Sequence, residues 1–181
     1  MKSFDTFFDE VKIIKPEIFH DTRGYFFESF NQAELQQIVN RQIHLIQENN
    51  SSSKKNVIRG LHYQVSPFQQ AKLIRVIKGE IFDVVVDIRK NSINFGKWVG
   101  VTLSEFNKNQ IWIPEGFAHG FLTLSDKAEI IYKTNNYYEP KSERTIKWND
   151  PDIDIKWPLN NEPILSERDQ KGNFLKQSQL L

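Results

Sequence analysis

The chain has 181 residues, with 24 Lys and Arg against 23 Asp and Glu, a net charge of +1, and no cysteine. It therefore lacks the basic excess typical of nucleic-acid-binding proteins. Disulfides, thiolate nucleophiles and cysteine metal sites are excluded. No stretch approaches the roughly 18 apolar residues of a membrane span, and residues 1–14 lack the apolar core of a signal peptide. We expect a cytoplasmic protein with one domain over residues 1–181 and no nucleic-acid or membrane partner.

The first 56 residues predict one strand, one helix and one loop. Val11–Lys15 resembles a strand that could add to the sheet edge of a partner. Asn31 can cap a helix that runs to about Arg41, in which Leu35 and other apolar residues recur at helical spacing. The polar run 51–56 (SSSKKN) is typical of a loop.

Strand patterns dominate the middle of the chain, with Asn, Gly, Pro or Ser-Asp between them. Residues 81–88 (IFDVVVDI) are almost continuously apolar, as expected of a strand buried on both faces. Lys78-Gly79 before them suits a hairpin turn, which predicts that Lys72–Val76 and Glu80–Ile88 pair with each other. Short strands at this spacing predict an all-β antiparallel sandwich or barrel with a few short helices, one of them near the end of the chain. The predicted strands are Val57–Gln64, Lys72–Val76, Glu80–Ile88, Trp98–Leu103, Gln110–Ile113, Gly120–Leu124 and Glu129–Thr134.

Residues 57–64 (VIRGLHYQ) carry the first candidate site residues. Strand alternation places Gly60 and His62 on one face and Arg59 and Leu61 on the other. A bulge at Gly60 could bring Arg59 to the same side as His62. Taken alone, the segment also fits an exposed arginine and a hydrogen-bonded core histidine.

Pro114–His119 has the pattern Pro-x-Gly-x-x-His, which resembles the second motif of cupins, small β-barrels in which this histidine faces the interior. In metal-binding cupins the first motif supplies a His-x-His pair and a downstream Glu. The corresponding stretch here reads His62-Tyr63-Gln64, with Lys72 following. Because an amide and an ammonium group cannot replace imidazole and carboxylate ligands, we expect no resident metal. Taken alone, Lys72 is equally consistent with a lysine that points outward into solvent. Tyr132 alone is equally consistent with a tyrosine that fills the core.

Six motifs follow one another along the chain: Asp21–Glu28, Gln47–Asn49, Val57–Gln64, Trp112–Gly120, Ser142–Arg144 and Leu165–Asp169. In this order, and over a match from about residue 4 to residue 175, they resemble the dTDP-4-dehydrorhamnose 3,5-epimerases. This resemblance implies a cupin-type jelly roll that forms a homodimer, binds a dTDP-sugar and needs no cofactor. The implied reaction inverts C3 and C5 of dTDP-4-dehydro-6-deoxy-D-glucose during dTDP-L-rhamnose synthesis.

The resemblance also implies roles for individual residues. His62 would remove the protons at C3 and C5 while Asp169 holds its ring. Lys72 would stabilise the enolate oxygen at C4, and Tyr132 would return a proton from the opposite face of the sugar. The implied substrate-binding residues are Arg23 and Arg59 at the pyrophosphate, Phe26 and Tyr138 against the thymine, His119 near the sugar, and Glu28, Gln47, Asn49, Glu143 and Arg168, where relatives often have Lys.

Three other functions remain open at this point. A relative on the same barrel could invert a single carbon or act as a 3,4-ketoisomerase. Tyr132 beside His62 favours epimerisation, because a proton shuttle on one face needs no donor opposite. The other two are a metal-dependent cupin such as a dioxygenase, and a sugar-binding module without activity, which would leave Lys72 and the pair of His62 with Asp169 without a role.

Overall fold

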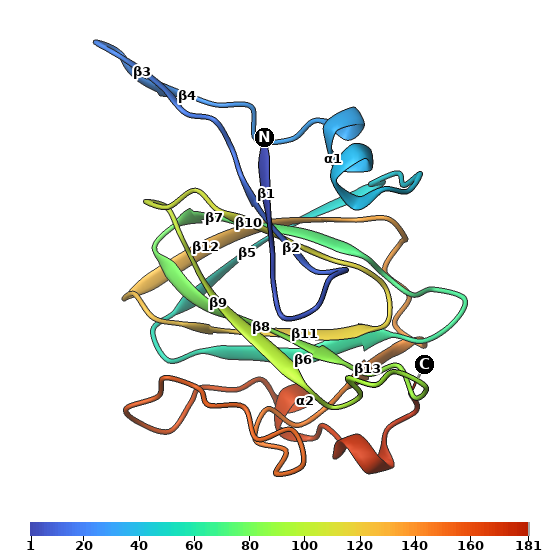
Figure 1. The fold of residues 1–181 in the computed structure, drawn as a ribbon. Coiled ribbons are helices and arrows are strands. Elements are labelled where there is room, and N and C mark those ends of the chain that lie inside the picture. Colours follow the sequence, from blue (N-terminus) through green and yellow to red (C-terminus); the bar gives the residue numbers. More distant parts are fainter. Residues whose placement is uncertain (181) are drawn as a thin grey trace.

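The computed structural model describes residues 1–180 and arranges its strands in two antiparallel sheets packed face to face, from which a hairpin projects (Figure 1). The six-stranded sheet has the order β1 (Lys2–Asp5), β2 (Lys12–Lys15), β10 (Gln110–Ile113), β7 (Lys72–Lys78), β12 (Lys127–Thr134) and β5 (Gln47–Lys54). The five-stranded sheet has the order β13 (Glu143–Thr145), β6 (Ile58–Gln64), β11 (Phe117–Thr123), β8 (Glu80–Asp87) and β9 (Trp98–Ser104). The hairpin is β3 (Phe19–Asp21) with β4 (Gly24–Phe26), and the helical segments are α1 (Gln32–Val39), α2 (Glu167–Gln170) and the 3₁₀ turn η1 (Leu175–Gln177). The predicted antiparallel all-β architecture is confirmed. The predicted pairing of the strands on either side of Lys78-Gly79 is wrong, because β7 and β8 belong to different sheets and the chain crosses from one sheet to the other at this turn.

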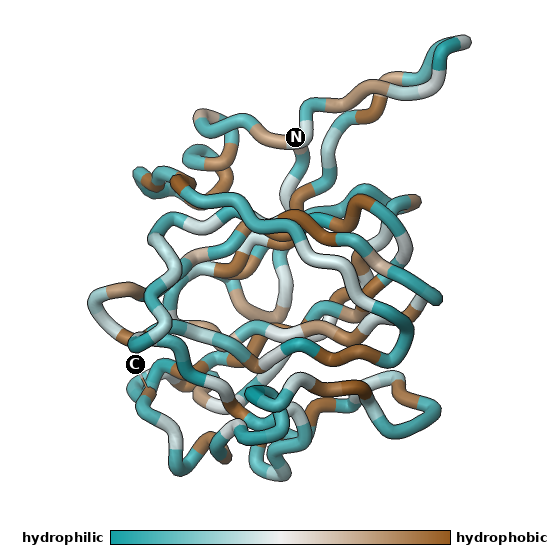
Figure 2. The backbone as a smooth tube through the Cα atoms, turned by 180° about the vertical axis from the view of Figure 1, so that it is seen from behind, coloured by the Kyte–Doolittle hydropathy of each residue, from teal (hydrophilic) through white to brown (hydrophobic). Residues whose placement is uncertain are grey.

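Apolar side chains fill the space between the sheets and also cover the outer face of the five-stranded sheet. Val85 of β8 lies in the inner cluster, whereas its neighbours Val84 and Val86 pack outward against Ile153 and Leu175 of the C-terminal segment. Strand β8 is therefore buried on both faces, which confirms the prediction from its continuous apolar run. Figure 2 shows the apolar residues (brown) along the strands of both layers.

Helix α1 forms where the sequence predicts a helix, and it covers part of the outer face of the six-stranded sheet. The Asn31 side chain accepts hydrogen bonds from the backbone N–H groups of Ala33 and Glu34, and the helix ends at Asn40 in the left-handed conformation. Leu35 is buried in a cluster with Trp112. No helix within residues 1–180 is long and apolar enough to cross a membrane.

The loop prediction for residues 51–56 is wrong for Ser51–Lys54, which belong to β5. This strand has no apolar residue, yet it pairs with β12 along its whole length, from Gln47 opposite Thr134 to Lys54 opposite Lys127. The paired backbone, together with a polar cavity on its inner face, explains why a strand forms without apolar alternation. Sequence pattern alone indicates strands that bury apolar side chains, and β5 buries none.

Strand β6 contains a bulge at Gly60, which confirms the predicted arrangement that brings Arg59 to the same side as His62. His62 lies opposite His119, but Arg59 lies opposite Phe121, so three steps along β6 match two steps along β11. Gly60 has φ +126°, and a Cβ there would lie 2.5 Å from the Gly120 Cα atom. The close approach of the two strands thus requires glycine at this position.

Gly60→Ala should destabilise the protein more than Gly24→Ala. Both glycines have strongly positive φ, +126° and +131°, but a Cβ on Gly24 meets nothing within 4 Å. Each substitution carries about 1–3 kcal/mol of backbone strain, and only Gly60→Ala adds a steric clash with β11. Urea unfolding of both variants measures the difference, and equal losses of unfolding free energy would contradict this account of the bulge.

Candidate active site

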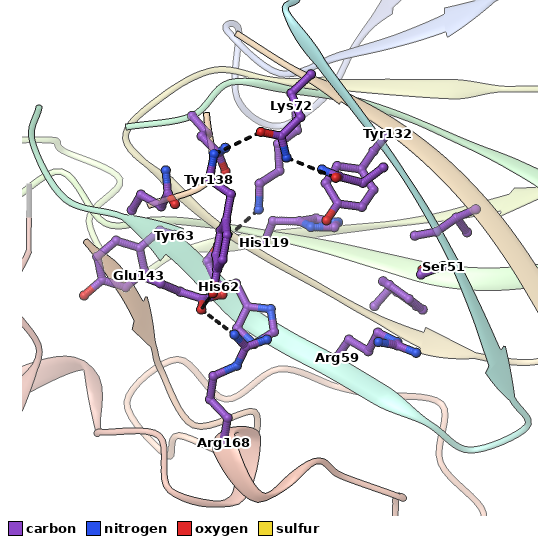
Figure 3. Close-up of a pocket in the computed structure, with 16 residues that line it drawn as sticks. Ser51, Arg59, His62, Tyr63, Lys72, His119, Tyr132, Tyr138, Glu143 and Arg168 are labelled. Carbon is purple, nitrogen blue, oxygen red and sulfur yellow. Dashed lines mark hydrogen bonds and ion pairs between the residues drawn. The ribbon is translucent and has the colours of Figure 1, made fainter. Parts of the chain in front are cut away.

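A cavity of about 330 Å³ lies between the sheets and collects most of the predicted site residues (Figure 3). Strand β5 contributes from the edge of one sheet, β7 and β12 from its interior, and β6, β11 and β13 from the opposing sheet. Antiparallel pairing therefore gathers residues that are far apart in sequence. The predicted residues that line the cavity are Gln47, Asn49, Arg59, His62, Lys72, His119, Tyr132, Tyr138, Glu143 and Arg168.

The imidazole of His62 is held by Asp169, which lies behind it. His62 Nε2 is 2.5 Å from Asp169 Oδ1, and Ser166 Oγ donates to Asp169 Oδ2 at 2.9 Å. Ser166 also caps α2 by accepting from the Asp169 N–H. Burial alone would raise the pKa of Asp169, but hydrogen bonds from His62 and Ser166 and the charge of Arg168 lower it below the ordinary value. The carboxylate is thus ionised at neutral pH, and it leaves His62 Nδ1 as the basic nitrogen.

Lys72 extends from the first position of β7 into the cavity, beside the backbone of His62. Its Nζ lies 3.5 Å from the His62 carbonyl oxygen. Burial lowers the pKa of Lys72 to about 8, and the negative charges of Asp83 and Glu143 limit the fall. The ammonium group is therefore mostly charged at neutral pH, although it titrates far more easily than a surface lysine.

His119 projects from β11 and is held by a carboxylate that sequence reasoning missed. His119 Nε2 is 2.8 Å from Asp83 Oδ2 on β8, and Asp83 is fully buried. Burial lowers the pKa of His119 below its ordinary value, although the negative charge of Asp83 acts in the opposite direction. The ring is therefore neutral at pH 7. A charged residue inside the apolar run 81–88 is the signal that could have identified Asp83, because an unpaired carboxylate is costly in a core.

Tyr132 reaches the cavity from β12, in the sheet that faces β6 and His62 (Figure 3). Burial and the charge of Glu143 raise the pKa of its phenol, while the charges of Arg59 and Arg168 and the Asn49 side chain lower it. The phenol is thus protonated at neutral pH and can act as an acid. An imidazole and a phenol consequently line one cavity from opposite sheets.

Charged and aromatic groups surround the mouth of the cavity. Glu143 accepts a hydrogen bond from the Tyr138 hydroxyl at 2.7 Å and forms an ion pair with Arg168. Arg59 is fixed differently, since its Nε donates to Ser53 Oγ at 2.9 Å and its Nη2 to the Ser52 carbonyl at 3.0 Å. Two guanidinium groups and an exposed tyrosine ring suit an anionic ligand with an aromatic base.

Three predicted binding residues do not reach this cavity. Arg23 and Phe26 lie on the β3–β4 hairpin and Glu28 follows it, and the hairpin projects away from the sheets (Figure 1). The Arg23 side chain is 88% exposed, its ion pair is with Asp21 of the same hairpin, and Phe26 is 70% exposed. Their assignment to the substrate stays a prediction that the cavity of their own chain does not support.

The donor groups of the cavity do not resemble a metal site. The Gln64 side chain holds loop segments, donating to the Phe68 and Tyr137 carbonyl groups and accepting from the Glu139 N–H. The two imidazoles are each bonded to a carboxylate through Nε2. Among residues 1–180, no three His, Cys, Asp or Glu side chains are grouped to hold a metal ion.

Comparison with known proteins agrees with this geometry. Residues 5–177 match the family described as dTDP-4-dehydrorhamnose 3,5-epimerase. The Shigella flexneri protein of that name is 54% identical over 172 residues, which are 95% of this chain and 94% of that protein.

Two solved structures share the fold. The Legionella pneumophila dTDP-6-deoxy-D-glucose-3,5-epimerase, in complex with dTDP-4-keto-L-rhamnose, superposes with a TM-score of 0.94 at 47% identity, covering 97% of this chain and 93% of that one. A 3′-monoepimerase from Streptomyces bikiniensis, in complex with dTDP-quinovose, gives a TM-score of 0.90 at 31% identity, covering 95% and 87%. The cupin-type jelly roll is confirmed, and the chain belongs to the dTDP-4-dehydrorhamnose 3,5-epimerase family.

Proposed function

We propose that the protein is an isomerase that inverts C3 and C5 of dTDP-4-dehydro-6-deoxy-D-glucose. The observation that carries this proposal is the placement of His62 and Tyr132 on facing sheets of one cavity, with the Lys72 ammonium group in the same space. A hydrogen beside a ketone is a weak acid, so its removal needs a base together with a stabiliser of the enolate oxygen. Inversion needs a proton donor on the other face of the ring.

Each step has a residue suited to it. His62 takes the proton from carbon through the nitrogen that Asp169 leaves free, and the ketone becomes an enolate. Lys72 stabilises the oxygen at C4, where a fixed cation in a dry site is most effective. Tyr132 then gives its proton to carbon from the opposite face, and solvent restores both groups. The chemistry is redox-neutral, which agrees with the absence of a dinucleotide-binding Gly motif from the sequence.

The related proteins support both the substrate class and one alternative. The Legionella enzyme is described with dTDP-4-keto-L-rhamnose, whereas the Streptomyces bikiniensis protein on the same fold is a 3′-monoepimerase. Inversion of one centre is therefore the second candidate function. The number of carbons that acquire solvent hydrogen distinguishes the two.

In D₂O the product should carry deuterium at both C3 and C5, as counted by proton NMR. Tyr132→Phe should slow inversion at least about 10²-fold, because the general acid is lost. Exchange of the substrate hydrogens with retention should persist, because His62 remains. Tyr137→Phe, which alters an exposed ring outside the cavity, is the matched control. Deuterium at one carbon only would favour the monoepimerase, and Tyr132→Phe with normal inversion would contradict the role of the phenol.

The activity should fall as pH rises through about 8. The pKa of Lys72 is lowered to about 8, and the group acts as a cation, so its contribution is present below that pH and lost above it. Lys72→Met should reduce kcat by about 10²–10³, the usual effect of losing one oxyanion donor. The pH profile of kcat/KM for both forms is the measurement. A limb near pH 8 that persists in Lys72→Met would assign the titration to another group.

We further infer that the active form is a homodimer in which the β3–β4 hairpin reaches the cavity of the partner subunit. The hairpin pairs only with itself within residues 1–180 and exposes Phe19, Tyr25 and Phe26. Arg23 on the same hairpin would bind the pyrophosphate of the substrate together with the Arg59 guanidinium that lines that cavity. Strand β2 lies between β1 and β10, so the free sheet edge is β1, not the predicted Val11–Lys15.

Mixing two inactive variants tests this arrangement. Arg23→Ala/Phe26→Ala lacks the hairpin contacts and His62→Ala lacks the base, so each homodimer should be impaired. After subunit exchange at a one-to-one ratio, about half of the dimers are mixed and hold one intact site, and roughly a quarter of the wild-type activity should return. Activity no higher than the average of the two homodimers would show that the hairpin serves its own chain.

A further inference from the structure

The inner face of β5 presents an amide side chain to the phenol of Tyr132. Along this strand Gln47, Asn49 and Ser51 are half-buried and line the cavity, whereas Glu48 and Asn50 between them are exposed. Asn49 is paired directly with Tyr132 across the β5–β12 ladder. Directly opposed side chains in an antiparallel pair are close enough to interact.

A chain of hydrogen bonds fixes which end of the Asn49 amide faces the phenol. The Tyr138 backbone N–H donates to Gln47 Oε1 at 3.0 Å, and Gln47 Nε2 donates to Asn49 Oδ1 at 3.0 Å. A backbone N–H can only donate, so the Gln47 atom that it contacts must be the carbonyl oxygen, and the other end of the Gln47 amide must be the NH₂ group. The Asn49 carbonyl oxygen thus accepts the hydrogen bond from Gln47, and the NH₂ group is the end of the Asn49 amide that can donate to Tyr132.

Tyr132 needs such a donor because it becomes negatively charged when it acts as an acid. Burial and Glu143 on β13 raise the pKa of the phenol. Arg59 on β6, Arg168 on α2 and the Asn49 side chain act in the opposite direction. Asn49 is the one neutral side chain among the groups that lower the pKa of Tyr132, so its effect on that pKa depends on how its amide is oriented and not on a net charge.

We propose that Asn49 is a positioning residue that donates an N–H to the Tyr132 oxygen as the phenolate forms, with Gln47 and the Tyr138 backbone holding its amide in that orientation. The inference rests on the proposed epimerase function and deepens it. When the phenol O–H bond breaks and the new C–H bond forms, the oxygen keeps the electron pair and Asn49 stabilises it. Solvent later returns a proton to the phenolate.

The test is the partition of the carbanion between two fates in D₂O. The carbanion either takes deuterium from Tyr132 and inverts, or takes deuterium from His62, once that imidazolium has exchanged with solvent, and keeps its configuration. Both fates start from one intermediate, so substrate affinity and the amount of folded enzyme cancel from their ratio. Proton NMR of substrate and product during the reaction gives this ratio.

Asn49→Leu should lower the ratio of inversion to exchange with retention about tenfold, the effect of losing one hydrogen bond to a charged oxygen. Asn50→Leu makes the same change on the exposed face of the same strand and should leave the ratio unchanged. Gln47→Met keeps Asn49 but frees its amide to turn, so its ratio should fall by an intermediate amount.

The outcomes separate this inference from the proposed function. A wild-type enzyme that incorporates no deuterium at C3 or C5 would overturn the function itself. A wild-type enzyme that inverts, with Asn49→Leu changing KM but not the ratio, would overturn the inference alone and leave Asn49 a substrate contact. A Gln47→Met ratio equal to that of Asn50→Leu would overturn the orienting chain.

Discussion

The approach of β6 to β11 at Gly60 and Gly120 determines which side chains share the cavity. A Cβ on Gly120 would lie 2.9 Å from the Arg59 carbonyl oxygen and 3.2 Å from the Gly60 Cα atom, so the two backbones are almost in contact. The bulge that accompanies this approach rotates Arg59 to the side of His62. Ordinary period-two alternation would have directed the guanidinium and the imidazole to opposite faces of the sheet. A guanidinium group and an imidazole can therefore occupy one small space.

The two buried carboxylates of the site are each bonded to an imidazole, and Lys72 places a cation in the cavity. Asp169 and Asp83 each accept from an imidazole, which fixes the orientation of both rings. Desolvation lowers the pKa of Lys72 to about 8, and the nearby carboxylates of Asp83 and Glu143 oppose this fall, so the group is mostly cationic at neutral pH. Such fixed groups need no reorganisation when an enolate forms, which is why they are effective.

The sequence predicts those parts of the fold whose side chains follow an apolar pattern. Helix α1, the doubly buried β8 and the run of strands from β6 to β12 all carry such patterns, and the motif residues lead to most of the cavity. Strand β5 could not be predicted, because backbone pairing and a polar cavity stabilise it instead of apolar burial. The hairpin with Arg23 could not be placed either, since its contacts within residues 1–180 leave it exposed. The single domain and the cytoplasmic location stay predictions.

The pair of His62 and Asp169 joins two parts of the chain that are made at different times. The two residues are 107 positions apart, and Asp169 belongs to the segment that covers the outer face of the five-stranded sheet. During synthesis the ribosome delivers every strand of both sheets before it delivers α2. A nascent chain therefore has its imidazole before it has the carboxylate that orients it, and it has its five-stranded sheet before it has Leu175, which packs on the outer face of that sheet.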